Sequence, residues 1–220
     1  MERSEGVILG ITGGVAVGKS TVAKILAERG AAVVSADELA REVVAPGSKT
    51  LRILVAYFGT DILRRDGTLD RQVLGDIVFG NEEKRSFLNA VTHAAIAELA
   101  VRRLGDLEAR GAELIVYESP LLFEAKAEGR VDLVLVVKAP EKEQRDRLLR
   151  RPGMTAARAQ TMIAAQMSQQ EKASRGDFVI ETDGTLKELE EKVDALLLRL
   201  RELISAGFRS RRVTRPDSRA

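Results

Sequence analysis

The sequence contains no cysteine and only one histidine, His93. Without thiols the chain can form no disulfide, no thiol nucleophile and no cysteine-ligated metal site. A single imidazole likewise excludes a zinc site with several histidine ligands, and a histidine-based catalytic triad could use only His93. The absence of cysteine favours a cytoplasmic protein, and this is the location that we expect.

Long apolar runs are also missing. No run approaches the ~20 residues that a membrane-spanning helix needs, so we expect no membrane association. Residues 1–6 are polar and lack the apolar core of a secretion signal, and we therefore expect no export. The composition, 45% hydrophobic and 31% charged, is typical of a globular protein and excludes a disordered or collagen-like chain. The 220 residues suffice for one domain with an inserted subdomain.

The net charge of +2 conceals an asymmetry between the C-terminal tail and the rest of the chain. Residues 205–220 carry five arginines and one aspartate, which leaves 30 basic and 32 acidic residues for residues 1–204. We therefore expect no nucleic-acid-binding face on residues 1–204. We expect the tail to be a solvated, disordered terminus, with an arm that attracts polyanions as the alternative.

Short apolar runs rich in β-branched residues alternate with segments of helical periodicity. The runs predict strands at residues 7–11, 32–34, 114–117, 131–137 and 178–180. The periodic segments predict helices at residues 19–29, 38–44, 49–58, 70–79, 82–110, 141–151, 155–169 and 186–204. The apolar face of the last helix consists of Leu189, Val193, Leu196, Leu197 and Leu200. Strands that alternate with helices predict a three-layer α/β fold, in which helices cover both faces of a parallel sheet.

Two stretches depart from simple alternation. Residues from about 45 to 112 are helical between two strands, which is too long for one crossover and predicts a helical subdomain. Residues from about 141 to 175 form arginine-rich helices around Pro152-Gly153 and predict a mobile lid. We therefore expect a single domain over residues 1–204 that contains both parts, followed by the tail at 205–220.

The most specific motif spans residues 13–20, which read G-G-V-A-V-G-K-S and fit the pattern G-x-x-x-x-G-K-[ST] in full. A predicted strand precedes it and a predicted helix follows it. Glycines let successive backbone N–H groups face inward, and the helix adds its positive N-terminal end. The alternative is a chance glycine-rich turn. The motif predicts a nucleotide phosphate site made of Gly14, Val15, Ala16, Val17, Gly18, Lys19, Ser20 and Thr21.

Within this loop, Lys19 is expected to be exposed and to bridge the β- and γ-phosphates, and the Ser20 hydroxyl is expected to bind Mg²⁺. The chain lacks the N-K-x-D segment with which GTPases read guanine, and it is small for a translocating ATPase. Together with the arginine-rich segment, these features predict a P-loop NTPase-type sheet and an ATP-dependent phosphotransferase, whose lid arginines close over the transferred phosphoryl group.

Two acidic residues follow predicted strands, where parallel sheets present their ligand-binding edge. Asp37 comes just after the second strand and is our candidate general base, with a helix N-cap as the alternative. Glu118 directly follows the strand at 114–117. We expect it to lie beside the Mg²⁺ and to act on the ion through water or through Ser20. The alternative for Glu118 is a solvated acid at a strand end.

Arginines of the predicted lid are candidates for phosphate contacts. Arg147 and Arg151 lie four residues apart, so we expect them to share a helix face and to contact the nucleotide phosphates. Arg147 is expected to meet the γ-phosphate. A solvated basic face is the alternative for this pair, and it is the interpretation that we adopt for Arg145 and Arg150.

Several segments together resemble the dephospho-coenzyme A (dephospho-CoA) kinase family, and the resemblance runs from about residue 7 to residue 204. The P-L-L-F-E run at 120–124 matches a signature of this family. The other segments are residues 10–21, 35–44, 58–71, 77–79, 88–93, 144–151, 165–167 and 171–172.

This resemblance implies a kinase that uses ATP and Mg²⁺ to phosphorylate the ribose 3′-hydroxyl of dephospho-CoA, which gives coenzyme A and ADP in the last step of coenzyme A biosynthesis. It implies that Asp37, Arg41, Arg71, His93 and Leu121 bind the acceptor. The acceptor carries a diphosphate, which suits a basic Arg71. An exposed arginine beside an Asp70 helix cap is the alternative for Arg71, and a half-buried structural histidine is the alternative for His93.

Other interpretations remain open at this point. The chain could be a related small-molecule kinase that acts on a nucleoside or a nucleotide. It could also be an ATP-gated module that binds nucleic acid through its basic tail. We expect dephospho-CoA as the small-molecule partner, and a monomer or a weak homo-oligomer.

The sequence departs from the usual family pattern at a few positions. Ala16 stands where glycine is usual, which is free of strain only if the backbone angle φ is negative there. Thr182 stands where asparagine is usual, after the last predicted strand. Ser35 and Glu118 each replace an aspartate, and Ala94 replaces a proline. Ala16 and Thr182 bear on the affinity for the nucleotide.

Overall fold

The computed structural model describes residues 6–206 and residue 208. The expectations for the basic tail, whether disordered terminus or polyanion-binding arm, therefore lie almost entirely outside the described residues. No helix among the described residues combines the length and the hydrophobicity needed to cross a bilayer.

The structure contains a five-stranded parallel sheet in the order β2-β3-β1-β4-β5. The strands are β1 (Val7–Thr12), β2 (Ala32–Ser35), β3 (Leu114–Glu118), β4 (Leu133–Lys138) and β5 (Phe178–Glu181). All of the predicted strands are therefore present. Strand β1 pairs with β3 on one side and with β4 on the other, and all six of its residues are buried. This burial explains why its sequence, V-I-L-G-I-T, lacks any charged residue.

The chain divides into two compact units. The first unit comprises the residues up to Val33 and those from Asp106 onward, and it holds most of the sheet. Its helices are α1 (Lys19–Glu28), α6 (Glu141–Leu149), α7 (Ala156–Ala164), α8 (Gln169–Arg175), α9 (Leu186–Ser205) and the short 3₁₀ helix η2 (Glu128–Arg130).

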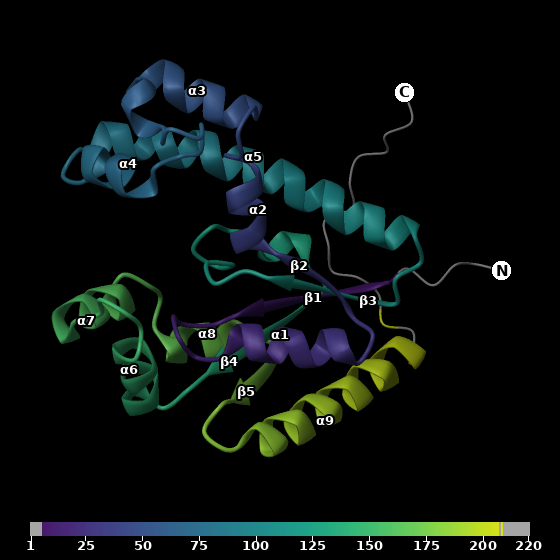
Figure 1. Ribbon diagram of the computed structural model, residues 1–220. Coiled ribbons are helices and arrows are strands. Elements are labelled where there is room, and N and C mark those ends of the chain that lie inside the picture. Colours follow the sequence, from purple (N-terminus) through teal and green to yellow (C-terminus); the bar gives the residue numbers. More distant parts are fainter. Residues whose placement is uncertain (1–5, 207, 209–220) are drawn as a thin grey trace. The chain divides into compact units, whose positions relative to one another are not determined.

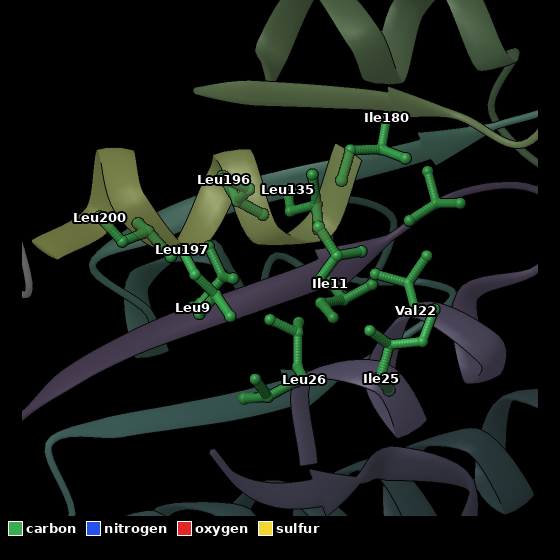
Figure 2. Close-up of a cluster of buried hydrophobic side chains, with 14 of the residues drawn as sticks. Leu9, Ile11, Val22, Ile25, Leu26, Leu135, Ile180, Leu196, Leu197 and Leu200 are labelled. Atoms are coloured by element: carbon green, nitrogen blue, oxygen red, sulfur yellow. The ribbon is translucent and has the colours of Figure 1, made fainter. Parts of the chain in front are cut away.

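Helices α1 and α9 lie side by side against the sheet of the first unit (Figure 1). Figure 2 shows their apolar side chains meeting those of β1 and β4, where Leu9, Ile11 and Leu135 are fully buried. The predicted apolar face of α9 is confirmed, since the buried residues of this helix are Leu189, Val193, Leu196, Leu197 and Leu200. A capping box at Thr185 and Glu188 fixes the start of α9.

The second unit, Val34–Gly105, is mostly helical. It contains α2 (Ala36–Glu42), α3 (Lys49–Phe58), the 3₁₀ helix η1 (Thr60–Ile62), α4 (Arg71–Val78) and most of α5 (Glu82–Ala109). The rings of Tyr57 and Phe87 stack with 3.8 Å between their centroids. The α/β class with a parallel sheet flanked by helices is thus confirmed. The division into a kinase domain at 1–204, a subdomain near 45–112 and a lid near 141–175 stays a prediction.

Two helix boundaries differ from the predicted ones in a way that affects the site. The predicted helix at 155–169 is in fact two helices, because α7 ends at Ala164 and the Ser168 hydroxyl caps a new helix, α8, by accepting from the N–H of Glu171. Helix α6 ends at Leu149, before Arg151. Arg147 and Arg151 therefore do not share a helix face.

Candidate active site

The glycine-rich loop runs from the end of β1 to the start of α1, as predicted. Gly13 has φ +150°, and a Cβ atom there would lie 2.1 Å from the carbonyl oxygen of Val137. Gly18 has φ +94° and is the N-cap of α1. Both positions therefore require glycine. The first-turn N–H groups of α1 and its positive end suit a bound phosphate anion.

Ala16 adopts a left-handed backbone with φ +58°. The condition under which alanine would fit without strain, a negative φ, is therefore not met. A side chain in this conformation costs roughly 1–2 kcal/mol because Cβ approaches the following carbonyl oxygen. Such strain persists where the surroundings hold the backbone in place, and it is common at ligand-binding loops.

The side chain of Lys19 is buried, with 7% of the residue exposed, so the expectation of an exposed lysine was wrong. Lys19 is the first residue of α1, and its Nζ donates a hydrogen bond to the carbonyl oxygen of Gly14 at 2.7 Å. The lysine thus folds back over the loop. This places its charge inside the turn whose amides are expected to hold phosphate.

The structure brings together two oxygen atoms that could bind a metal ion at the end of this loop. Ser20 Oγ donates to Glu118 Oε1 at 2.7 Å. Glu118 is the last residue of β3 and pairs in register with Ile11 of β1, which fixes it beside the loop. A hydroxyl and a carboxylate are the hard oxygen ligands that Mg²⁺ prefers, and Mg²⁺ at phosphate sites commonly needs only one or two carboxylates. The described residues contain no group of three or more acidic or histidine side chains that could hold a metal alone.

Arg147 lies against Thr182, the residue that follows β5. Its two terminal nitrogens donate to the hydroxyl and the carbonyl oxygen of Thr182, at 2.8 and 2.6 Å. It also donates to Glu143 at 2.6 Å. The Thr182 hydroxyl in turn donates to the carbonyl oxygen of Val17 at 2.7 Å. Thr182 therefore connects the arginine to the phosphate loop, whereas Arg151 lies in an exposed turn after α6.

A buried lysine supports the P-L-L-F-E segment. Lys172 has no exposed surface, and its Nζ donates to the carbonyl oxygen of Pro120 at 2.7 Å and to Glu124 Oε2 at 3.1 Å. The same Nζ forms an ion pair with Glu124 Oε1 at 2.8 Å. Burial of the Glu124 carboxyl raises its pKa, but hydrogen bonds from Lys172 and the backbone outweigh that effect and hold the pKa below its ordinary value. Leu121, in the same segment, is 43% exposed and so could contact a ligand.

Two of the predicted acceptor-binding residues lie on α2, in the second unit. Asp37 is the second residue of this helix and is exposed, and the N-cap is Ser35. The alternative interpretation of Asp37 as a helix N-cap was therefore wrong. Arg41 is exposed near the other end of α2.

The remaining acceptor candidates lie on α4 and α5. Asp70 does cap α4, and Arg71 follows it with an exposed side chain that donates to the carbonyl oxygen of Ala40 at 3.3 Å. Arg71 is thereby tied to α2, the helix that carries Asp37. His93 is exposed on α5, so the alternative of a half-buried structural histidine was wrong.

Three glutamines were missed as site residues by the sequence analysis. Gln144, Gln166 and Gln169 hydrogen-bond to Val15 of the loop or to one another. Two of them lie in segments that carry the family resemblance, but glutamine does not titrate, and its partners here are backbone groups and another glutamine. Neither composition nor spacing signals such contacts.

The parallel sheet has a complete phosphate loop after its central strand and an acidic strand end beside that loop. These features define a P-loop nucleotide-binding protein. A family model described as dephospho-CoA kinase matches residues 7–188. The chain therefore belongs to the dephospho-CoA kinase family, and membership implies that it uses ATP.

Curated relatives agree with this assignment, and a solved structure shares the fold. The dephospho-CoA kinase of Geobacter sulfurreducens is 46% identical over 86% of this chain and 96% of its own length. That of Anaeromyxobacter dehalogenans is 45% identical over 94% of this chain and 95% of its own length. A crystal structure of a Thermus thermophilus protein superposes with a TM-score of 0.74 at 35% identity, and covers 89% of this chain and 98% of the other.

Proposed function

We propose that this chain transfers the γ-phosphoryl group of ATP to the ribose 3′-hydroxyl of dephospho-CoA, the last step of coenzyme A biosynthesis. The hydrogen bond between Ser20 and Glu118, at the end of a complete phosphate loop, is the observation that carries the proposal. It joins two oxygen ligands of the kind that Mg²⁺ prefers, beside the loop that would hold the phosphates.

On the nucleotide side, the Lys19 ammonium and the loop amides hold the β- and γ-phosphates. The amide of Val15 is an exception, because it donates to Gln166. Ser20 and Glu118 hold Mg²⁺, directly or through water. When bound, this ion neutralises charge on the phosphate oxygens. Arg147 contributes positive charge to the transferring group, for which its guanidinium must leave or share its bonds to Thr182. Arg151 assists from the turn after α6.

On the acceptor side, Asp37 acts as general base. Its carboxylate accepts the proton of the 3′-hydroxyl, the oxygen forms a bond to the γ-phosphorus, and the bond from that phosphorus to the bridging oxygen breaks to release ADP. Arg41 and Arg71 pair with acceptor phosphates. His93 and Leu121 contact the rest of the acceptor.

Further parts of the proposal concern the setting of the enzyme. We propose that it works in the cytoplasm, as a monomer or a weak homo-oligomer, and without nucleic acid. The alternative of an ATP-gated nucleic-acid-binding module requires the tail. Because Phe208 packs against the apolar core, truncation should begin after this residue. The kinase proposal predicts that truncation leaves turnover within about twofold, a difference below ~0.5 kcal/mol.

The decisive experiment is an ADP-release assay with dephospho-CoA, adenosine, AMP and shikimate as acceptors. We expect release only with dephospho-CoA, and a product that carries the new phosphate on the ribose 3′-oxygen by phosphorus NMR. Faster release with adenosine or AMP would favour a nucleoside or nucleotide kinase instead. The ADP released without acceptor serves as the baseline.

A further inference from the structure

Three glutamines from separate segments converge on the phosphate loop of the first unit. Gln144 belongs to α6, Gln166 lies in the break between α7 and α8, and Gln169 is the first residue of α8. All three lie within residues 141–175, the predicted lid, and are far from the loop in sequence.

Two of these glutamines satisfy both polar backbone groups of one loop residue. The N–H of Val15 donates to Gln166 Oε1 at 2.8 Å. The carbonyl oxygen of Val15 accepts from Gln144 Nε2, also at 2.8 Å. Val15 lies outside any helix or strand, so it has no regular backbone partners of its own. The two side chains supply what secondary structure supplies elsewhere.

The third glutamine fixes the orientation of the first. Gln169 exchanges a pair of hydrogen bonds with Ala139, because its Oε1 accepts from the Ala139 N–H at 2.9 Å and its Nε2 donates to the Ala139 carbonyl oxygen at 3.1 Å. The same Nε2 donates to Gln144 Oε1 at 3.0 Å. Gln144 must then present its amide nitrogen to Val15. The backbone partners thus determine which amide atom is oxygen and which is nitrogen.

Burial makes this arrangement costly unless every bond is made. Gln144 is 2% exposed, and its Nε2 would lie 2.8 Å from a Cβ atom at Gly14. The lack of a side chain at Gly14 therefore lets the amide reach the loop. A buried amide without partners costs a few kcal/mol, and an apolar side chain would fill the same space without that risk.

The residues on either side of the strained Ala16 are thus both anchored. The glutamines hold Val15, and Thr182 holds the carbonyl oxygen of Val17. Ala16, at φ +58°, lies between these two anchors. A strained conformation persists only where neighbouring contacts over-determine it.

From these contacts we infer that Gln144 and Gln166 are positioning residues of the kinase. They bind the backbone N–H and carbonyl oxygen of Val15 and thereby hold the phosphate loop in the conformation that binds anions. Gln169 acts one step further away, through Gln144. The inference rests on the proposed nucleotide site at this loop. It assigns to the segment at 141–175 a role in shaping the loop, in addition to its arginines.

The test compares nucleotides that differ in the phosphate held by the loop. Gln144→Met and Gln166→Met keep side-chain volume but remove the bonds to Val15. We expect each to weaken ADP binding about tenfold, which corresponds to ~1.4 kcal/mol. AMP lacks the β-phosphate, and its affinity should change by less than about threefold. Gln170→Met, exposed on α8, is the matched control and should change neither affinity.

A merely structural role would lower the thermal midpoint and leave the ratio of ADP to AMP affinity unchanged. An unchanged ratio in both variants overturns the inference. Should Gln144→Met fail to fold, the half-buried Gln166→Met still decides. In the double variant we expect a loss smaller than the product of the single losses, because both side chains act on one residue, and full additivity contradicts that shared action.

Lys19→Ala, measured in the same way, separates this inference from the proposed site. If Lys19→Ala weakens ADP binding and the glutamine variants do not, the nucleotide site stands and the inference fails. If Lys19→Ala also leaves ADP binding unchanged, the nucleotide site itself has been misassigned.

Discussion

The hydroxyl of Ser20 donates a hydrogen bond to the carboxylate of Glu118, with 2.7 Å between Oγ and Oε1. The two residues come from α1 and β3 and lie 98 positions apart. Glu118→Gln keeps the size and an acceptor oxygen for Ser20 but removes the charge. We expect catalytic efficiency to fall about 10–100-fold and the Mg²⁺ concentration for half-maximal rate to rise.

The control for this prediction is Glu113→Gln, an exposed acid just before the same strand. It should leave both the rate and the Mg²⁺ requirement unchanged. A titration of activity against Mg²⁺ at saturating ATP measures both variants. An unaltered Mg²⁺ requirement in Glu118→Gln would remove Glu118 from the proposed metal site.

Lys19→Ala should nearly abolish turnover, because it removes the charge expected to bridge the β- and γ-phosphates. Lys24→Ala is the matched control, since Lys24 lies on the same helix with 77% of its side chain exposed. Single-turnover ADP formation measures both. A loss of less than about threefold in Lys19→Ala, ~0.7 kcal/mol of transition-state stabilisation, would contradict the phosphate-loop assignment.

The strands and the amphipathic faces could be predicted from the sequence because periodicity reports burial directly. The spacing of the five buried residues of α9 predicted its apolar face, and an uncharged run rich in β-branched residues predicted β1. The break between α7 and α8 could not be predicted. Residues 165–167 contain no glycine or proline, and the new helix starts because Ser168 caps it while Gln166 is held by Val15.

The site residues that could be predicted from the sequence are those that lie at or just after the ends of strands. Ser20 and Glu118 could be placed together because parallel strands end at one edge of a sheet. The burial of Lys19 was missed, since its spacing says nothing about a long side chain that folds back onto Gly14. The glutamine contacts were missed because they join side chains to a backbone residue 129 and 151 positions away.

Ala16→Gly should stabilise the protein. Glycine removes the ~1–2 kcal/mol cost of a side chain at φ +58°, partly offset by the ~0.4–1 kcal/mol that a more flexible unfolded chain costs. A net gain of about 1 kcal/mol raises the thermal midpoint of a chain this size by roughly 2–4 °C. The control Ala27→Gly, at an exposed position inside α1, should shift the midpoint downward instead. Shifts of the same sign would mean that Ala16 is not strained.

Arg147→Ala should lower kcat by about 10³, with little change in the KM for dephospho-CoA, because charge at the transferring phosphoryl group acts mainly in the transition state. Loss of its bonds to Thr182 should also reduce the free energy of unfolding by about 1 kcal/mol. Arg145→Ala, on the exposed side of α6, is the control and should change neither quantity. A variant whose only defect is a raised KM would assign Arg147 to ground-state binding.

The last prediction concerns Asp37, which lies in the first turn of α2 beside a second acid, Glu38. Both carboxylates interact favourably with the positive end of the helix dipole. Asp37→Asn and Glu38→Gln should therefore each lower the free energy of unfolding by only about 0.3–1 kcal/mol. Only Asp37→Asn should slow the reaction, by roughly 10²–10⁴ in kcat if it removes the general base. The loose transition state of phosphoryl transfer favours the lower end of that range. Thermal midpoints and single-turnover rates of the two variants decide the matter. Equal rates for both would mean that Asp37 serves the helix and not the reaction.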